Sequence, residues 1–178
     1  SLQRGRVVIG CVPTIASTVL PGVLVDFTRR YPGVAIRVLD VGAQELHRLV
    51  LNREVDIAIG PRPDRSEDLD FCSIARDHFV AVCSRDHILA SHVEVRLADL
   101  AGYPFLVVAT GTNVRGLLEQ AFKQQGFEFR PAYEFMNHYT LGGMIQAGVG
   151  ITAMPSMSIS MLSYPLLKAI RIVEPEIV

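Results

Sequence analysis

The stretch RVVIGCV, residues 6–12, is the first of three short runs rich in β-branched residues; VAIRVL at residues 34–39 and VDIAI at residues 55–59 are the others. Each run predicts a buried strand. Helical periodicity fills both gaps, because apolar residues recur every four positions from Ile15 to Tyr31 and a shorter helix is marked over residues 43–52. Strands and helices that alternate in this way predict an α/β fold with a mostly parallel sheet.

Pro21 lies inside the first helical pattern and cannot donate a backbone hydrogen bond there. The helix therefore either kinks at Pro21 or begins there, and we expect a kink. The polar residues 61–68 predict a loop, and residues 69–76 and 79–84 indicate two further extended runs.

A second α/β unit follows in the sequence. It begins with a predicted strand over residues 105–108, and an amphipathic helix then runs from Val114 to Phe122, with Gly126 as a left-handed residue after its end. Further strands are predicted over residues 132–135, 149–153 and 168–173, with a short helix that ends at Gly148 between the first two. No linker-like composition separates the two units.

Composition and charge exclude several classes of function. The chain has 178 residues, with 17 Lys and Arg against 18 Asp and Glu, and therefore lacks the basic surface that direct nucleic-acid binding demands. Its three cysteines, Cys11, Cys72 and Cys83, are widely spaced in predicted buried strands, which favours a reducing compartment. No apolar run is long enough to span a bilayer, so we expect a cytoplasmic protein without membrane contact.

Enzyme and cofactor motifs are absent from the sequence. It contains no glycine-rich nucleotide loop, no G-x-S-x-G elbow and no H-E-x-x-H pair, and its five histidines do not fall at zinc-ligand spacing with the cysteines. We interpret the pairs Asp77-His78 and Asp86-His87 as surface polar groups and not as an acid–base relay, because neighbouring residues of an extended chain usually point apart. We therefore expect no catalysis, no cofactor and no metal.

Hydroxyl-rich turns follow one predicted strand in each unit. Thr14, Ser17 and Thr18 open the first helix, and the residues Thr110, Gly111, Thr112 and Asn113 follow the strand at 105–108. Ligands of open α/β sheets bind outside the carboxyl ends of the strands, where helix starts favour anions. The two turns could hold a small carboxylate, or their residues could simply cap helices.

Three more residues are candidates at the same strand ends. Pro61 follows the third strand and could line the site, and Gln44 could offer an amide to a ligand or face solvent. His138 follows the strand at 132–135, where it is either a pocket residue or a surface or cap residue.

Five stretches of the chain, in order and in register, resemble the effector-binding domain of LysR-type transcriptional regulators. They are LPGVLVDFTRRYPGVAIRV at 20–38, REVDIAIGPRP at 53–63, FVAVCSRDHILA at 79–90, GTNVRGLLEQAF at 111–122 and GGMIQAGVGITAMP at 142–155. The resemblance covers essentially the whole chain.

The resemblance implies two Rossmann-like lobes of the type II periplasmic-binding-protein fold. Lobe I would comprise residues 1–76 and 153–178, and lobe II residues 77–152, with an inducer held between them. The family's pocket falls here on Pro13, Thr14, Ala43, Gln44, Pro61, Thr110, Gly111, Thr112, Asn113 and His138. Family members place a basic or hydroxyl residue where this chain has Pro61, and Arg115 is a candidate for the missing cation.

The resemblance also implies an inducer-sensing role without catalysis. The winged helix-turn-helix that binds DNA in family members, and a final strand and helix, are absent from this sequence. A homodimer or homotetramer is expected, with the helix over residues 43–52 as a candidate contact. A periplasmic solute-binding protein and an enzyme of the same fold are the alternatives; the first would begin with a signal peptide, and the second needs a phosphate loop or a paired acid and base.

Overall fold

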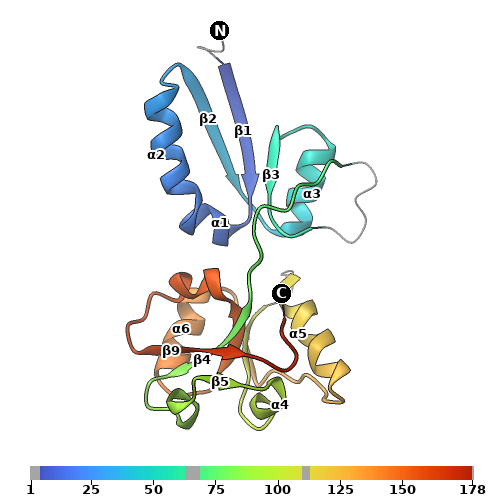
Figure 1. Cartoon of the computed structure of the whole chain (residues 1–178), viewed down its shortest axis with the longest axis vertical. Coiled ribbons are helices and arrows are strands. Elements are labelled where there is room, and N and C mark those ends of the chain that lie inside the picture. Colours follow the sequence, from blue (N-terminus) through green and yellow to red (C-terminus); the bar gives the residue numbers. More distant parts are fainter. Residues whose placement is uncertain (1–4, 63–68, 110–112, 178) are drawn as a thin grey trace. The chain divides into compact units, whose positions relative to one another are not determined.

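A computed structural model describes residues 5–62, 69–109 and 113–177 of the chain. The chain forms two compact units, Ser1–Ile74 and Ala75–Val178, here called unit 1 and unit 2 (Figure 1).

Unit 1 is built on a three-stranded parallel sheet. Its strands β1 (Gly5–Cys11), β2 (Val34–Asp40) and β3 (Ile57–Ile59) lie in the order β2-β1-β3. The helices α2 (Leu20–Arg30) and α3 (Ala43–Leu51) flank the strands on either side (Figure 1). The predicted alternation of strands and helices with parallel pairing is confirmed.

The first helix is broken at Val19, two residues before the expected kink at Pro21. The short helix α1 (Pro13–Thr18) ends before Val19, and α2 starts at Leu20, so that Pro21 lies in the first turn of α2. Proline is tolerated there because the N–H groups of a first turn have no partner within the helix. The expected kink inside one continuous helix was wrong, and the alternative, a helix that begins near Pro21, is what the chain forms.

Two glycines let α3 approach the sheet of unit 1. A Cβ atom added to Gly10 in β1 would come within 2.7 Å of one methyl group of Leu46. A Cβ atom added to Gly60, just after β3, would come within 2.6 Å of the other methyl group of Leu46. Leu46 is almost fully buried as a result. The helix is thereby held against the strands whose ends carry the candidate site.

Unit 2 contains a four-stranded mixed sheet and a two-stranded parallel sheet. The larger sheet has the order β5-β9-β4-β8, and the smaller sheet pairs β6 with β7. Their bounds are β4 (Phe79–Ser84), β5 (Glu94–Val95), β6 (Leu106–Val108), β7 (Tyr133–Phe135), β8 (Thr152–Pro155) and β9 (Leu167–Ile172). The helices are α4 (Leu97–Leu100), α5 (Asn113–Gln124) and α6 (His138–Gln146), and the 3-10 turns are η1 (Ile88–Ser91) and η2 (Ser156–Leu162).

The last part of the chain belongs to unit 2. We expected residues 153–178 in lobe I, but β8 and β9 both pair antiparallel with β4. The backbone N–H of Phe79 also donates to the carbonyl of Ile177, which is buried. The boundary between the units falls between Ile74 and Ala75, close to the expected residue 76.

The expected extended run over residues 69–76 forms no strand in the described part of the chain. Cys72 is exposed there as a free thiol, whereas Cys11 and Cys83 lie buried in β1 and β4. The prediction of three buried cysteines was therefore wrong for Cys72, because a strand needs a partner that local sequence does not reveal.

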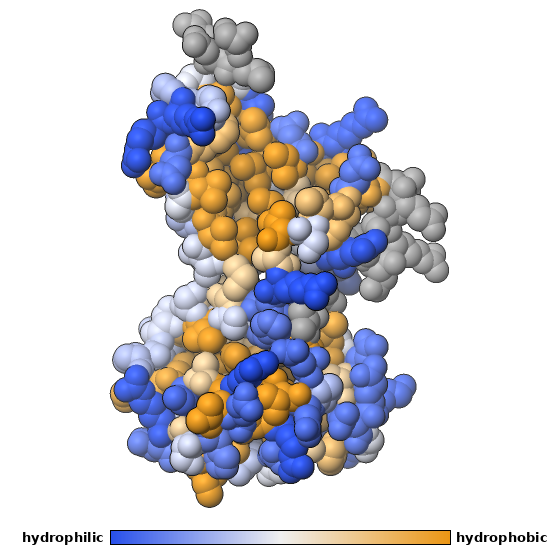
Figure 2. Space-filling view, in the orientation of Figure 1, coloured by the Kyte–Doolittle hydropathy of each residue, from blue (hydrophilic) through white to orange (hydrophobic). Residues whose placement is uncertain are grey.

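The buried core lies mainly in unit 2. Its larger cluster contains the ring contacts of Phe105 with Phe122 and Phe129, whose centroids lie 5.6 Å and 5.2 Å apart. Unit 1 leaves apolar side chains of α2 and β3 accessible, and Figure 2 shows hydrophobic surface over this face of the unit. None of the helices in the described ranges is long and apolar enough to cross a membrane.

Gly150 marks a close backbone approach in unit 2. A Cβ atom at this position would overlap the carbonyl oxygen of Pro104, which accepts the N–H of Ile151 at 3.0 Å. We expect Gly150→Ala to lower the free energy of unfolding by about 2 kcal/mol, because a backbone atom cannot turn away as a side chain can. Urea titration followed by circular dichroism measures the loss.

Gly102→Ala is the matched control for this prediction. Gly102 is exposed, and no heavy atom lies within 4 Å of a Cβ added to it. Equal stability of the two variants would contradict the packing described for Gly150.

Candidate functional site

The carboxyl ends of all three strands of unit 1 lie at one edge of its sheet. Cys11, the last residue of β1, is in register with Asp40 of β2 and Ile59 of β3. Two backbone hydrogen bonds continue this pairing beyond the strands: Val41 donates to Cys11 at 3.0 Å, and Val12 donates to Ile59 at 3.2 Å. The turns that leave the three strands are thus held side by side.

Five of the sequence-predicted residues lie in these turns of unit 1. Pro13 and Thr14 form the first turn of α1, Ala43 and Gln44 begin α3, and Pro61 follows β3. Thr14, Ala43 and Pro61 are half-buried, whereas Pro13 and Gln44 are exposed. The structure therefore brings the predicted residues of unit 1 to the same edge.

Ser17 does not present its hydroxyl proton to a ligand. Its Oγ donates to the carbonyl oxygens of Pro13 at 2.9 Å and Thr14 at 3.2 Å, and Thr18 donates to the same Thr14 carbonyl at 2.6 Å. Serine and threonine often bond to the preceding helical turn in this way. Ser17 could meet a ligand only as an acceptor, and its main role here is to close α1.

Sequence reasoning missed three polar residues near this edge. The Nε2 atom of His47, on α3, lies 3.2 Å from the carbonyl oxygen of Pro61 and donates to it in the tautomer that carries the Nε2 proton. The guanidinium of Arg62 lies 5.4 Å from the ring centroid of Phe71. Asp40 ends β2 with an exposed carboxylate. Their positions beside strand ends were the only sequence signal available.

Burial disfavours the thiolate form of both buried cysteines. Burial raises the pKa of the Cys11 thiol, and the nearby carboxylate of Asp40 raises it further. Burial also raises the pKa of Cys83, which outweighs the opposite effect of Lys168. Because the thiolate is the nucleophilic form, neither residue is suited to covalent catalysis.

A second strand-end edge occurs in unit 2. Val108 of β6 is in register with Phe135 of β7, and the N–H of Ala109 donates to the Phe135 carbonyl at 2.6 Å. His138 begins α6 three residues after β7, and Asn113 begins α5. Thr110, Gly111 and Thr112 lie outside the described residues.

His138 is a partly buried titratable residue at this edge. It is half-buried, and burial lowers its pKa below the ordinary value of 6.5, which favours the neutral imidazole at pH 7. Asn137 caps α6, with its Oδ1 accepting the N–H of Thr140 at 2.8 Å. The cap role considered for His138 is therefore taken by its neighbour.

Arg115 does not supply the missing cation. Its Nε donates to Glu119 at 2.8 Å and its Nη1 to Glu134 at 2.7 Å, and only 19% of its side chain is exposed. These bonds tie α5 to β7 and raise the pKa of Arg115. The expectation that Arg115 replaces a basic residue at Pro61 was wrong, because two carboxylates already occupy its guanidinium.

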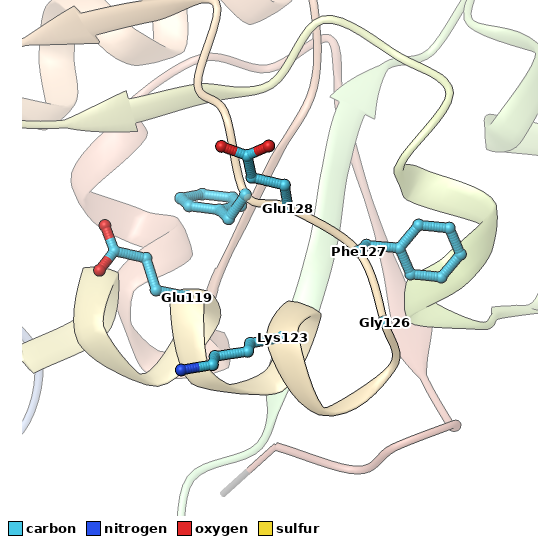
Figure 3. Close-up of a pocket in the computed structure, with 6 residues that line it drawn as sticks. Glu119, Lys123, Gly126, Phe127 and Glu128 are labelled. Atoms are coloured by element: carbon cyan, nitrogen blue, oxygen red, sulfur yellow. The ribbon is translucent and has the colours of Figure 1, made fainter.

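A shallow hollow in unit 2, with a volume of about 440 Å3, lies elsewhere. It is lined by the last turns of α5 and by the loop after it, where Figure 3 shows Glu119, Lys123 and Glu128. Asn113, at the start of the twelve-residue α5, is roughly 15 Å from its far end. The carboxylates are already paired, Glu119 with Arg115 and Glu128 with Arg130. The hollow is therefore not part of the strand-end site.

Within residues 5–62, 69–109 and 113–177, no group of three His, Cys, Asp or Glu side chains could hold a metal ion. Asp77, from one of the acid–histidine pairs, is instead used in structure: it accepts the hydroxyl of Ser156 at 2.6 Å and the N–H of Met157 at 3.2 Å. His78 contacts Glu176 rather than Asp77. Asp77 therefore fixes the start of η2.

The chain belongs to the family whose model is described as the LysR substrate binding domain, which matches residues 1–178. It is 31% identical over 175 residues to the uncharacterized HTH-type transcriptional regulator YbhD of Escherichia coli K12, a match that covers 98% of this chain and 55% of YbhD. The chain spans about half the length of the curated relatives it matches.

Solved structures show the same fold. The effector binding domain of QuiR in complex with shikimate aligns with a TM-score of 0.84 at 20% identity, over 98% of this chain and 84% of that one. The regulatory domain of CcmR from Synechocystis PCC6803, in complex with 2-PG, aligns with a TM-score of 0.83 at 21% identity, over 95% and 81% of the two chains. The fold is thus the type II periplasmic-binding-protein fold expected from the sequence.

Proposed function

We propose that this domain senses a small organic carboxylate for a bacterial LysR-type transcriptional regulator. The observation that carries the proposal is the gathering of Thr14, Gln44 and Pro61 at one strand-end edge of unit 1, with His138 at the corresponding edge of unit 2. Ser17 of unit 1 and residues 110–113 of unit 2 are further candidate contacts for the effector. The effector-bound relatives QuiR and CcmR support this class of ligand.

The chemistry of the site favours binding without reaction. A hydroxyl at Thr14, an amide at Gln44 and a neutral imidazole at His138 are hydrogen-bond donors that suit a carboxylate. The buried thiols have raised pKa values, so they offer no nucleophile. We therefore propose a sensor that releases its ligand unchanged.

The two alternatives have less support. They are a periplasmic solute-binding protein and an enzyme of the same fold. The family match over residues 1–178 and the 31% identical regulator favour the sensor. On this proposal the protein acts in the cytoplasm.

The signal would pass to DNA through the geometry of an oligomer. The effector binds one conformation of the domain better than another, and the shift in population changes how DNA-binding segments outside this chain are spaced. A homodimer or homotetramer with α3 as a contact would serve this role. A coupling of about 1–3 kcal/mol gives a response of about 5- to 150-fold.

A thermal-shift screen tests the proposal. The 178-residue chain is heated with shikimate, benzoate, succinate or glutamate, and each compound is recovered and analysed afterwards. At about 100 times its dissociation constant a ligand adds about 2.7 kcal/mol of stability, which raises the melting temperature by several degrees. A melting temperature that none of these carboxylates raises, or a recovered compound that has been converted, would contradict the proposal.

A further inference from the structure

We infer that Arg62 is the cation that selects a carboxylate at the strand-end edge of unit 1. The inference rests on the proposed function, because it assigns the charge recognition within the same site. It starts from a deficit: Thr14, Gln44 and His138 supply hydrogen bonds but no positive charge, and Arg115 is occupied by two glutamates.

The placement of the arginines in unit 1 singles out Arg62. Among the described residues of the unit, it is the one arginine that follows the carboxyl end of a strand. Arg48 is bonded to Glu45 and Glu54. The other arginines lie elsewhere: Arg6 and Arg37 lie within strands, Arg29 and Arg30 lie in the last turn of α2, and Arg53 lies in the turn before β3.

Two contacts define where the guanidinium of Arg62 lies. His47 lies within hydrogen-bond distance of the Pro61 carbonyl, at 3.2 Å, and so links α3 to the residue before Arg62. The guanidinium of Arg62 itself lies 5.4 Å from the ring centroid of Phe71. An aromatic face attracts a cation but does not neutralise its charge. Stacking therefore orients Arg62 and leaves its N–H groups able to meet an anion.

Among the described residues no carboxylate lies within ion-pair distance of the guanidinium of Arg62. Asp40, the carboxylate at the same edge, ends β2, and β1 separates β2 from β3. Two strand spacings, about 10 Å, therefore lie between the ends of β2 and β3. Asp40 therefore does not pair with Arg62.

A planar guanidinium suits a carboxylate because two parallel N–H groups match its two oxygens. The specificity that follows is for the ionised acid over its neutral amide of the same shape. This preference distinguishes a recognition role from a structural one, since a residue that only supported the turn would affect both ligands alike.

The test compares matched ligands on matched variants. Shikimate, benzoate, succinate and glutamate are each titrated calorimetrically beside the corresponding primary amide. For the carboxylates that bind the parent chain, Arg62→Gln should weaken binding about five-fold and leave the amides within about two-fold. Arg62→Lys, which keeps the charge but not the planar fork, should fall between, and Phe71→Leu should weaken carboxylate binding about two-fold.

Arg30→Gln is the control, because Arg30 also lies over an aromatic ring, at 5.8 Å from the centroid of Tyr31, but at the end of α2. It should change neither ligand set. Unchanged carboxylate affinity in Arg62→Gln, or equal losses for acids and amides, would overturn the assignment while leaving the proposed function in place. Failure of every carboxylate to bind the parent chain would overturn the proposed function and this inference with it.

Discussion

Thr14→Val should weaken binding of a carboxylate effector about 10-fold or more. Thr14 is half-buried in the first turn of α1, directly after β1. Valine keeps the shape and the β-branching of threonine but removes the hydroxyl. A hydrogen bond to a charged acceptor contributes about 1.5–3 kcal/mol, which sets the size of the expected loss. Isothermal titration with the carboxylates that stabilise the parent chain measures it.

Thr28→Val is the matched control for Thr14→Val. The Thr28 hydroxyl donates to the Leu24 carbonyl at 2.8 Å on α2, away from the strand ends. Its loss should leave affinity within about two-fold. Equal affinity of the parent and Thr14→Val would remove Thr14 from the site. Thr112→Val applies the same test to the second group of sequence-predicted residues, 110–113.

Phe122→Ala should lower the free energy of unfolding by about 3–5 kcal/mol. Phe122 is 2% exposed, and its ring lies 5.6 Å from that of Phe105 and 5.1 Å from that of Phe129. The substitution leaves a cavity under α5 that the aromatic cluster fills only in part. The chain has no tryptophan, so urea unfolding is best followed by circular dichroism.

Phe127→Ala provides the comparison, because Phe127 lies in the loop just after α5, five residues from Phe122, but is 39% exposed. Its cost should stay below about 1 kcal/mol. A loss below 1 kcal/mol in Phe122→Ala would mean that this cluster is not the core of unit 2.

Local pattern was enough to predict most of the elements. The period-four apolar residues of α2 and the β-branched runs of β1 and β2 are properties of single segments. Pairing is not such a property. The run KAIRIV predicted a strand near β9, but nothing within it indicated that it would pair with β4, more than eighty residues away. The same non-local choice decided that residues 69–76 would remain outside a sheet.

The site was predictable to the same degree. The rule that ligands bind at the carboxyl ends of strands located Thr14, Gln44 and Pro61 from sequence, because it needs only strand order. It could not tell that Ser17 bonds back to Pro13, or that Arg115 is held by glutamates 4 and 19 residues away. The roles of His47 and Arg62 depend on side-chain direction, which strand order leaves undetermined.

Chemical-shift mapping tests the central claim most directly. The 15N-labelled chain is titrated with the carboxylate that stabilises it in the thermal screen, and the compound is analysed afterwards. The account predicts that amides at the strand-end edges, around Thr14 and Gln44 or around His138, shift on titration, and that the compound is recovered unchanged. Shifts that spare both strand-end edges, or conversion of the compound, would contradict it.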